Sequence, residues 1–300
     1  MQELLDLNEN YGMMTFFLIT TDHLEDRLWF RDDEDFKVAM NYVAVVAYLM
    51  GVDVLAFILM SNHVHFVLQC AEEKAWAFIT EFKRHYSYYL SRKYGAKESL
   101  RGNGVDVRPL GLDGELERAI AYVQMNCVAA NICLNPADYP WGSGNCFFRA
   151  VPEDKGRMLG SLSVRARNRM MHSKFDLPTE WIVGEEAYIL PRSFVNVTFV
   201  EQLYRNPKNM DYYLRNSSKA KRRLALREEG LPSFRDQIIL AAIPDLCQTI
   251  FHKWGIGELG EEQRSALVSQ IRRRFSADVN QIARVTGIPY SDVARMLEGF

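Results

Sequence analysis

Cysteines are few in this sequence, and they are not spaced for pairing. The chain holds five of them, Cys70, Cys127, Cys133, Cys146 and Cys247, and no two form a Cys-x-x-Cys pair. An odd number without that spacing argues against a disulfide framework and against a zinc site built from thiolates. A reducing compartment such as the cytosol is therefore expected.

Long apolar runs, an imbalance of charge and internal repeats are also missing. No apolar run reaches the roughly 20 residues that a membrane-spanning helix needs, and the first residues, MQELLDLNENYG, lack the apolar core of a signal peptide. Lys and Arg number 36 against 38 Asp and Glu, so the overall charge identifies no partner. The 300 residues, 48% of them hydrophobic, predict one large globular domain or two ordinary ones, with no membrane contact.

Strand-like and helix-like segments alternate in the first half of the sequence. Strands are predicted over 16–21, 52–60 and 63–69, with Ser61 and Asn62 as the turn of a hairpin. Helices are predicted over 38–51, 75–95 and 115–133, and the Gly-rich stretch before the last helix is predicted as a loop or short hairpin. This order indicates an α+β fold with an antiparallel sheet and helices on one face.

Composition changes near residue 150, where the sequence becomes polar, basic and rich in turn residues. We therefore predict a first domain over 1–150 and a mainly helical region over 151–300. The stretch 280–297, NQIARVTGIPYSDVARML, resembles a helix-turn-helix, with Gly287 at the turn. A helical hairpin that only packs is the alternative.

Two of the six histidines, His63 and His65, lie one residue apart in the predicted strand 63–69. Side chains alternate across a strand, so both imidazoles point to one face, about 6–7 Å apart at the backbone, and Val64, Phe66 and Leu68 point to the other. This arrangement suits convergence on one metal ion. The alternative is a chance pair of exposed histidines, because no cysteine or further histidine stands at an obvious ligand spacing.

The helix predicted over 115–133 carries Tyr122 and Asn126 four residues apart, and thus on one helical face. An amide oxygen on Asn126 can ligate a hard cation, and the Tyr122 phenol would then lie beside whatever that cation polarises. The alternative is an ordinary tyrosine of an amphipathic helix.

Taken together, VLAFILMSNHVHFVLQ and AYVQMNCVAANICLNPADYPWGS resemble the single-tyrosine (HUH) transposases of the IS200/IS605 type, and within them the REP-associated tyrosine transposases. That family has a His-hydrophobic-His strand, a helix with one tyrosine and an amide residue four positions later, and a Tyr-Pro-Trp run, here Tyr139 to Trp141. The resemblance covers about the first half of the chain. Ala129 replaces the arginine that the family carries after the amide residue, and Gly142 replaces a common serine.

This resemblance implies a ferredoxin-like or RRM-like palm. It also implies a metal-dependent single-strand DNA endonuclease and strand transferase, with His63, His65 and Asn126 as ligands of Mg²⁺ or Mn²⁺. Tyr122 would be the nucleophile that forms a 5′-phosphotyrosine with single-stranded or hairpin DNA. The expected location is the bacterial cytoplasm, at the nucleoid when DNA is bound. A DNA-binding regulator that no longer cuts, a metallohydrolase without a covalent step, and a homodimer all stay open.

DNA contacts are predicted from basic and polar side chains in three segments. The helix over 75–95 mixes basic and aromatic residues, the stretch RNSSKAKRRLALR is densely basic, and the helix-turn-helix presents polar residues at its second helix. Solvated helix faces are the alternative for the first two. The predicted contacts are Lys83, Arg84, Arg222, Arg223, Tyr290, Ser291 and Arg295.

Overall fold

The computed structural model describes residues 15–21, 28–95, 100, 104–130, 132–149, 155–172, 174–217, 234–275 and 277–298. The first elements are β1 (Thr15–Thr20), α2 (Asp33–Met50), β2 (Asp53–Met60), β3 (His63–Cys70), α3 (Glu72–Tyr94), β4 (Asp106–Leu110), α4 (Glu115–Gln124) and α5 (Asn126–Ala129). They are followed by β5 (Gly156–Met158), α6 (Val164–Met170), β6 (Ile182–Gly184), α7 (Val197–Tyr204) and α8 (Pro207–Asn216). The last are α10 (Asp236–Phe251), α11 (Glu261–Phe275), α12 (Val279–Thr286) and α13 (Tyr290–Glu298).

The main sheet has four strands in the order β2-β3-β1-β4, and every pairing in it is antiparallel. The connectivity β1-α2-β2-β3-α3-β4 is that of the ferredoxin-like motif. This confirms the predicted α+β class and the hairpin of β2 and β3. The Gly-rich stretch that was predicted as a loop or hairpin supplies β4, whose Arg108 pairs with Leu18 of β1.

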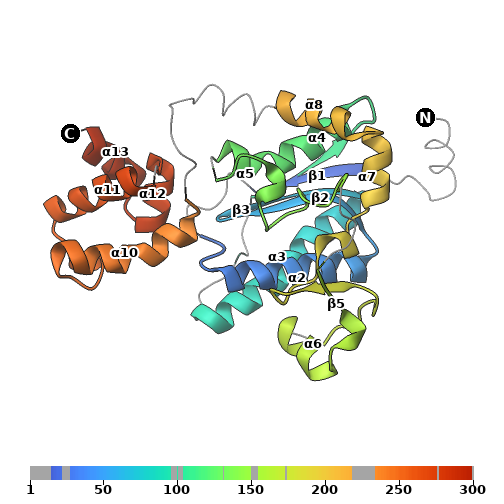
Figure 1. Ribbon diagram of the computed structural model, residues 1–300, viewed down its shortest axis with the longest axis horizontal. Coiled ribbons are helices and arrows are strands. Elements are labelled where there is room, and N and C mark those ends of the chain that lie inside the picture. Colours follow the sequence, from blue (N-terminus) through green and yellow to red (C-terminus); the bar gives the residue numbers. More distant parts are fainter. Residues whose placement is uncertain are drawn as a thin grey trace.

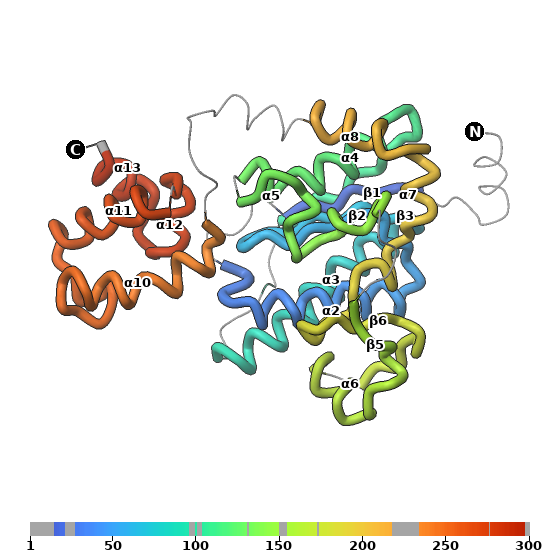
Figure 2. The backbone as a smooth tube through the Cα atoms, viewed as in Figure 1, coloured from blue at the N-terminus to red at the C-terminus, as the bar shows by residue number. Residues whose placement is uncertain are grey.

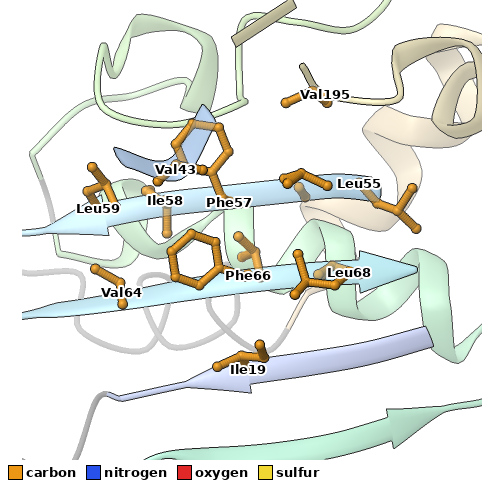
Figure 3. Close-up of a cluster of buried hydrophobic side chains, with 14 of the residues drawn as sticks. Ile19, Val43, Leu55, Phe57, Ile58, Leu59, Val64, Phe66, Leu68 and Val195 are labelled. Carbon is orange, nitrogen blue, oxygen red and sulfur yellow. The ribbon is translucent and has the colours of Figure 1, made fainter. Parts of the chain in front are cut away.

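Helices α2 and α3 cover one face of the sheet, and α4 lies on the other (Figure 1). On the α2 and α3 side, the Phe66 ring lies 5.0 Å from Phe78 and 5.5 Å from Phe82 between ring centres. Figure 3 shows Phe66 together with Val64 and Leu68 in this buried cluster, as the alternation of β3 predicts. The two-residue period of β3 thus places its apolar side chains in the largest core of the protein.

One helix was predicted from 115 to 133, but the structure ends regular helix earlier. Helix α4 stops at Gln124, and the short α5 begins at Asn126. Met125 between them has ψ near 1°, outside the usual helical value. The amide of Met125 still donates to the Ala121 carbonyl oxygen at 3.0 Å, and the Asn126 side chain donates to the Tyr122 carbonyl oxygen at 2.9 Å, so Tyr122 and Asn126 stay one turn apart.

Residues 155–217 belong to the N-terminal unit by their packing. Val195 bridges Val54 of β2, and the Tyr204 hydroxyl donates to the Glu117 carbonyl oxygen at 2.6 Å. Among the described residues from 234 onward, a separate core forms around Ile239, Leu267 and Ile282, among others. Described residues up to 217 thus share the core of the N-terminal unit, and those from 234 onward form a core of their own. The domain boundary expected near residue 150 stays a prediction. Figure 2 shows the C-terminal helices grouped apart from the rest.

The run from Tyr139 to Ser143 continues the sheet beyond β2. The Leu59 amide donates to the Trp141 carbonyl oxygen at 2.8 Å, and the Tyr139 hydroxyl donates to the Leu59 carbonyl oxygen at 2.8 Å. A Cβ at Gly142 would lie 2.8 Å from the Phe57 carbonyl oxygen. The close approach of the Phe57 carbonyl oxygen thus requires glycine at this position. None of the described helices is long and apolar enough to cross a membrane.

Candidate functional site

His63 and His65 lie at the start of β3 and share the face opposite to Phe66. Their ring centres are 5.0 Å apart, with an angle of 79° between the planes. His65 is fully buried, whereas His63, the first residue of the strand, is partly exposed. The predicted meeting of the two imidazoles on one face is what the structure shows.

Asn62, the turn residue before β3, orients the first imidazole. Its side-chain oxygen lies 2.9 Å from His63 Nδ1. With that oxygen as acceptor, Nδ1 carries the hydrogen and Nε2 keeps its lone pair, the tautomer that can bind a metal through Nε2. Sequence reasoning used Asn62 only as a turn residue, although an amide directly before a His-x-His strand was a usable signal.

Helix α4 brings Tyr122 to the second imidazole. The ring centres of Tyr122 and His65 are 5.5 Å apart, and the planes meet at 84°, an edge-to-face contact. The two residues are far apart in sequence, so this contact exists because α4 packs on the histidine side of the sheet. Tyr122 is only partly buried, which leaves part of its side chain open to solvent.

Two fully packed tyrosines elsewhere in the core, Tyr139 and Tyr86, have structural partners. Tyr139 is 3% exposed and donates to the Leu59 carbonyl oxygen. Burial raises its pKa well above the usual 10, so its phenol stays protonated. Tyr86 donates in the same way to the Trp29 carbonyl oxygen at 2.8 Å, and burial raises its pKa as well. Tyr122 differs from both in its exposure and in its place beside an imidazole.

Asn126 is buried, with 3% of its side chain exposed. Its amide nitrogen donates to the carbonyl oxygens of Tyr122, at 2.9 Å, and Val123, at 3.2 Å. Because both partners are acceptors, the nitrogen must face them, and the side-chain oxygen is turned away from these two carbonyls. These two bonds fix the orientation of the Asn126 amide.

Within the described ranges, no three side chains of His, Cys, Asp or Glu gather in a way that would hold a metal. A cation at the histidine pair would therefore need a ligand of another type, such as an amide oxygen. Two imidazoles and one amide oxygen fit Mn²⁺ well and Mg²⁺ acceptably, because both accept oxygen ligands and Mn²⁺ also accepts imidazole.

The residues predicted to contact DNA differ in how exposed they are. Lys83 is only 7% exposed, with its Nζ 5.8 Å from the centre of the Trp29 ring; this corrects its prediction as part of an open basic face. Arg84 is exposed and bonded to Glu81, with Nη2 2.6 Å from Oε2. Tyr290, Ser291 and Arg295 are all exposed on α13. Arg222 and Arg223 lie outside the described residues.

Comparisons with known proteins give one coarse likeness. No protein-family model and no curated protein matches the chain. Among solved structures, the chain is similar to a REP-associated tyrosine transposase bound to a REP hairpin, at 10% identity and a TM-score of 0.36. The similarity covers 45% of this chain and 81% of that one.

Proposed function

We propose that this protein nicks and rejoins single-stranded or hairpin DNA through a covalent bond to Tyr122, as single-tyrosine transposases do. The observation that carries the proposal is the contact between His65 and Tyr122, with ring centres 5.5 Å apart. Packing brings a phenol to a pair of imidazoles that already share one strand face. A chance pair of exposed histidines would have no such partner, and His65 is fully buried.

His63, His65 and Asn126 would hold the cation. When bound there, Mg²⁺ or Mn²⁺ supplies Lewis-acid polarisation of a non-bridging phosphate oxygen. Asn62 keeps His63 in the ligating tautomer, through the 2.9 Å contact at Nδ1. The backbone bonds of Asn126 keep its amide from rotating, so its oxygen is already oriented before DNA arrives.

Tyr122 supplies the nucleophile. Its phenolic oxygen attacks phosphorus and forms the phosphotyrosine bond while the bond from phosphorus to the 3′ oxygen breaks. The phenol loses its proton, and the departing 3′ oxygen gains one. Attack by the 3′-hydroxyl of another strand reverses these steps and releases Tyr122. The phosphotyrosine bond conserves the energy of the phosphodiester, so rejoining needs no ATP.

The test uses a library of DNA hairpins with randomised stems and single-stranded flanks, incubated with the full chain and Mn²⁺. A 5′-phosphotyrosine retains the downstream strand, so a label at the DNA 3′ end stays with the protein in SDS, whereas a 5′ label is released. We expect Tyr122→Phe to abolish the labelled band. Tyr212→Phe is the matched control, because that tyrosine is 64% exposed on α8.

The other outcomes identify the competing functions. Cutting by Tyr122→Phe at the wild-type rate would mean a metallohydrolase without a covalent step. Hairpin binding with no adduct in Mg²⁺ or Mn²⁺ would mean a DNA-binding regulator that does not cut. Either result overturns the proposal.

A further inference from the structure

The last two helices form a compact pair with one side open. Helix α12 ends at Thr286 and is capped by Gly287, whose φ of 70° is left-handed; α13 starts three residues after this glycine, at Tyr290. Ile282 and Val293 are fully buried and join the pair to the core of the C-terminal helices. A short glycine-containing turn between two such helices is the geometry of a helix-turn-helix.

The exposed side of α13 carries groups that can read base edges. Tyr290 is 55% exposed, and Ser291 and Arg295 are exposed as well. Arg295 Nη2 lies 3.0 Å from Asp292 Oδ1, one turn back. A donor from the last turn of this helix and an acceptor from its first turn therefore stand together. Both types contact bases in the major groove, Arg to guanine and Asp to cytosine.

Positive charge gathers beside the pair. Helix α11 ends in Arg272, Arg273 and Arg274, all exposed, directly before the start of α12. Arg272 Nη1 donates to the Ala277 carbonyl oxygen at 2.8 Å, which ties this arginine to the segment before α12. Exposed arginines flanking a helix pair are suited to backbone phosphates.

A polar joint, here called the 234–237 clamp, ties α12 to the histidine end of the sheet. Asp236 is 2% exposed; Arg284 of α12 lies 3.1 Å from it, and Gln281 of α12 donates to it at 2.8 Å. On either side of Asp236, Arg235 pairs with Asp33 at 3.0 Å, and Gln237 donates to the Phe30 carbonyl oxygen at 2.7 Å.

Phe30 in turn lies against the hairpin turn that precedes His63. The amides of Trp29 and Phe30 donate to the Ser61 carbonyl oxygen at 2.8 and 3.1 Å. The first helix of the pair is thus linked, through Asp236, Gln237 and Phe30, to the hairpin turn that precedes the strand with both imidazoles. Figure 1 shows the C-terminal helices beside the sheet, joined to it at the start of α10.

We infer that α12 and α13 form a site for double-stranded DNA, separate from the histidine site, with α13 in the major groove, and that the clamp holds this duplex at the histidine end of the sheet. An α-helix fits the roughly 12 Å width of that groove. Tyr290, Ser291 and Arg295 would contact bases, and Arg273 a phosphate. This duplex site does not depend on cleavage by Tyr122.

The first test selects from a pool of 30-base-pair duplexes with randomised centres, using the full chain. We expect one sequence family to be enriched. Arg295→Ala should lower the affinity for the enriched duplex by between about 5-fold and about 100-fold, and the affinity for an unselected duplex by less. Arg273→Ala should weaken both alike and lower the slope of log K against log salt by about one. Arg165→Ala, exposed on α6, is the matched control.

Failure here is distinguishable from failure of the proposed function. Tyr122→Phe should keep the selected duplex at wild-type affinity even though it forms no adduct. If no sequence is enriched, and Arg295→Ala and Arg273→Ala bind the pool as the wild type does, the duplex site is refuted. If only the DNA adduct is lost and the selected duplex is still bound, the duplex site is supported and the proposed cleavage function is the one that fails.

Whether the clamp holds the C-terminal helices against the sheet is tested by measuring the distance between the two units. Spectroscopic labels at positions 73 and 254, both exposed, report the separation of the two units. We expect one narrow distance distribution in the wild type and a broader one in the double variant Arg235→Ala with Gln237→Ala, while affinity for the selected duplex is unchanged. Equal widths in the two proteins would refute the clamp.

Discussion

Two polar clusters lie on opposite sides of the same sheet, and they are built from different chemistry. Between α2 and α3, the buried Asp35 carboxylate accepts hydrogen bonds from Tyr89, Tyr94 and Lys93 at 2.8–3.0 Å. The Arg31 amide adds a fourth, at 2.8 Å. On the other side, His63, His65, Tyr122 and Asn126 contribute two imidazoles, a phenol and an amide, with no carboxylate among them.

The two clusters differ in how their polar groups are matched by partners inside the protein. In the Asp35 cluster, opposite charges meet and a buried carboxylate is matched by internal donors, so the cluster joins two helices. Burial raises the pKa of Tyr89 and of Tyr94, which keeps both phenols as donors. The histidine cluster combines groups that can bind a cation and attack a phosphate, and it lies at a strand end with Tyr122 and His63 partly exposed.

The largest change expected is from Asp35→Ala. Removing this carboxylate leaves Lys93 and two tyrosine hydroxyls without their buried acceptor, so we expect the free energy of unfolding to fall by about 3–5 kcal/mol. Urea unfolding measures it, with Glu73→Ala, exposed on α3, as a control within about 0.5 kcal/mol. A loss under about 1 kcal/mol would show that this cluster is not the structural one.

Next in size is His63→Ala, which acts on the other cluster. We expect adduct formation to fall more than about 100-fold, or about 2.8 kcal/mol, because a metal ligand is lost. The unfolding free energy should change by less than about 1 kcal/mol, since His63 is partly exposed. Gln69→Ala, on the same face of β3 and also partly exposed, should leave the adduct at its wild-type level.

A smaller effect is expected from Asn62→Ala. Loss of the acceptor at His63 Nδ1 frees the ring to rotate and to change tautomer, so the Mn²⁺ concentration that half-saturates adduct formation should rise about 10-fold to 100-fold. Asn62→Asp retains an acceptor and should restore the wild-type value. An unchanged Mn²⁺ requirement in Asn62→Ala would remove Asn62 from the site.

The smallest effect is expected from Asp32→Ala, at the edge of the Asp35 cluster. Asp32 caps α2 by accepting from the Asp35 amide at 2.9 Å, and loss of such a cap costs about 0.5–2 kcal/mol. Burial acts to raise the pKa of Asp32, but bonds from Lys93 and the Asp35 backbone outweigh it and bring the pKa below 3.8. A lowered carboxylate pKa stabilises the fold above the unfolded value, and this contribution is lost as the pH falls through the folded one. The difference between variant and wild type should therefore be full at neutral pH and shrink below pH 3.8; a constant difference in urea unfolding would contradict this.

Local pattern predicted much of the fold, and it failed where packing decides. The hairpin of β2 and β3 followed from strand alternation around Ser61 and Asn62. Strand β4 was missed because a five-residue edge strand with a proline, Asp106–Leu110, carries little signal of its own. The change of composition near residue 150 does not coincide with a gap in the packing, because Val195 bridges β2 and Tyr204 is buried against α4.

In the candidate site too, local sequence predicted some features and missed others that depend on packing. Lys83 was read as part of a basic face, since spacing along a helix does not reveal that Trp29 covers it. Asn62 contacts the residue directly after it, so its role was within reach of the local sequence. The clamp residues Arg235 and Gln237, in contrast, contact Asp33 and Phe30 across a long separation in the chain, which no local pattern reveals.

Two features of the candidate site follow from local sequence alone. His63 and His65 share one face because side chains alternate along a strand, and Tyr122 and Asn126 lie one turn apart because they are four residues apart in a helix. Tertiary packing then places α4 on the imidazole face, which brings the centre of the Tyr122 ring to 5.5 Å from that of His65. Residues that are neighbours in sequence set the direction in which a side chain points. Which two faces meet depends on core packing between residues that are far apart in sequence, and local periodicity carries no information about that packing.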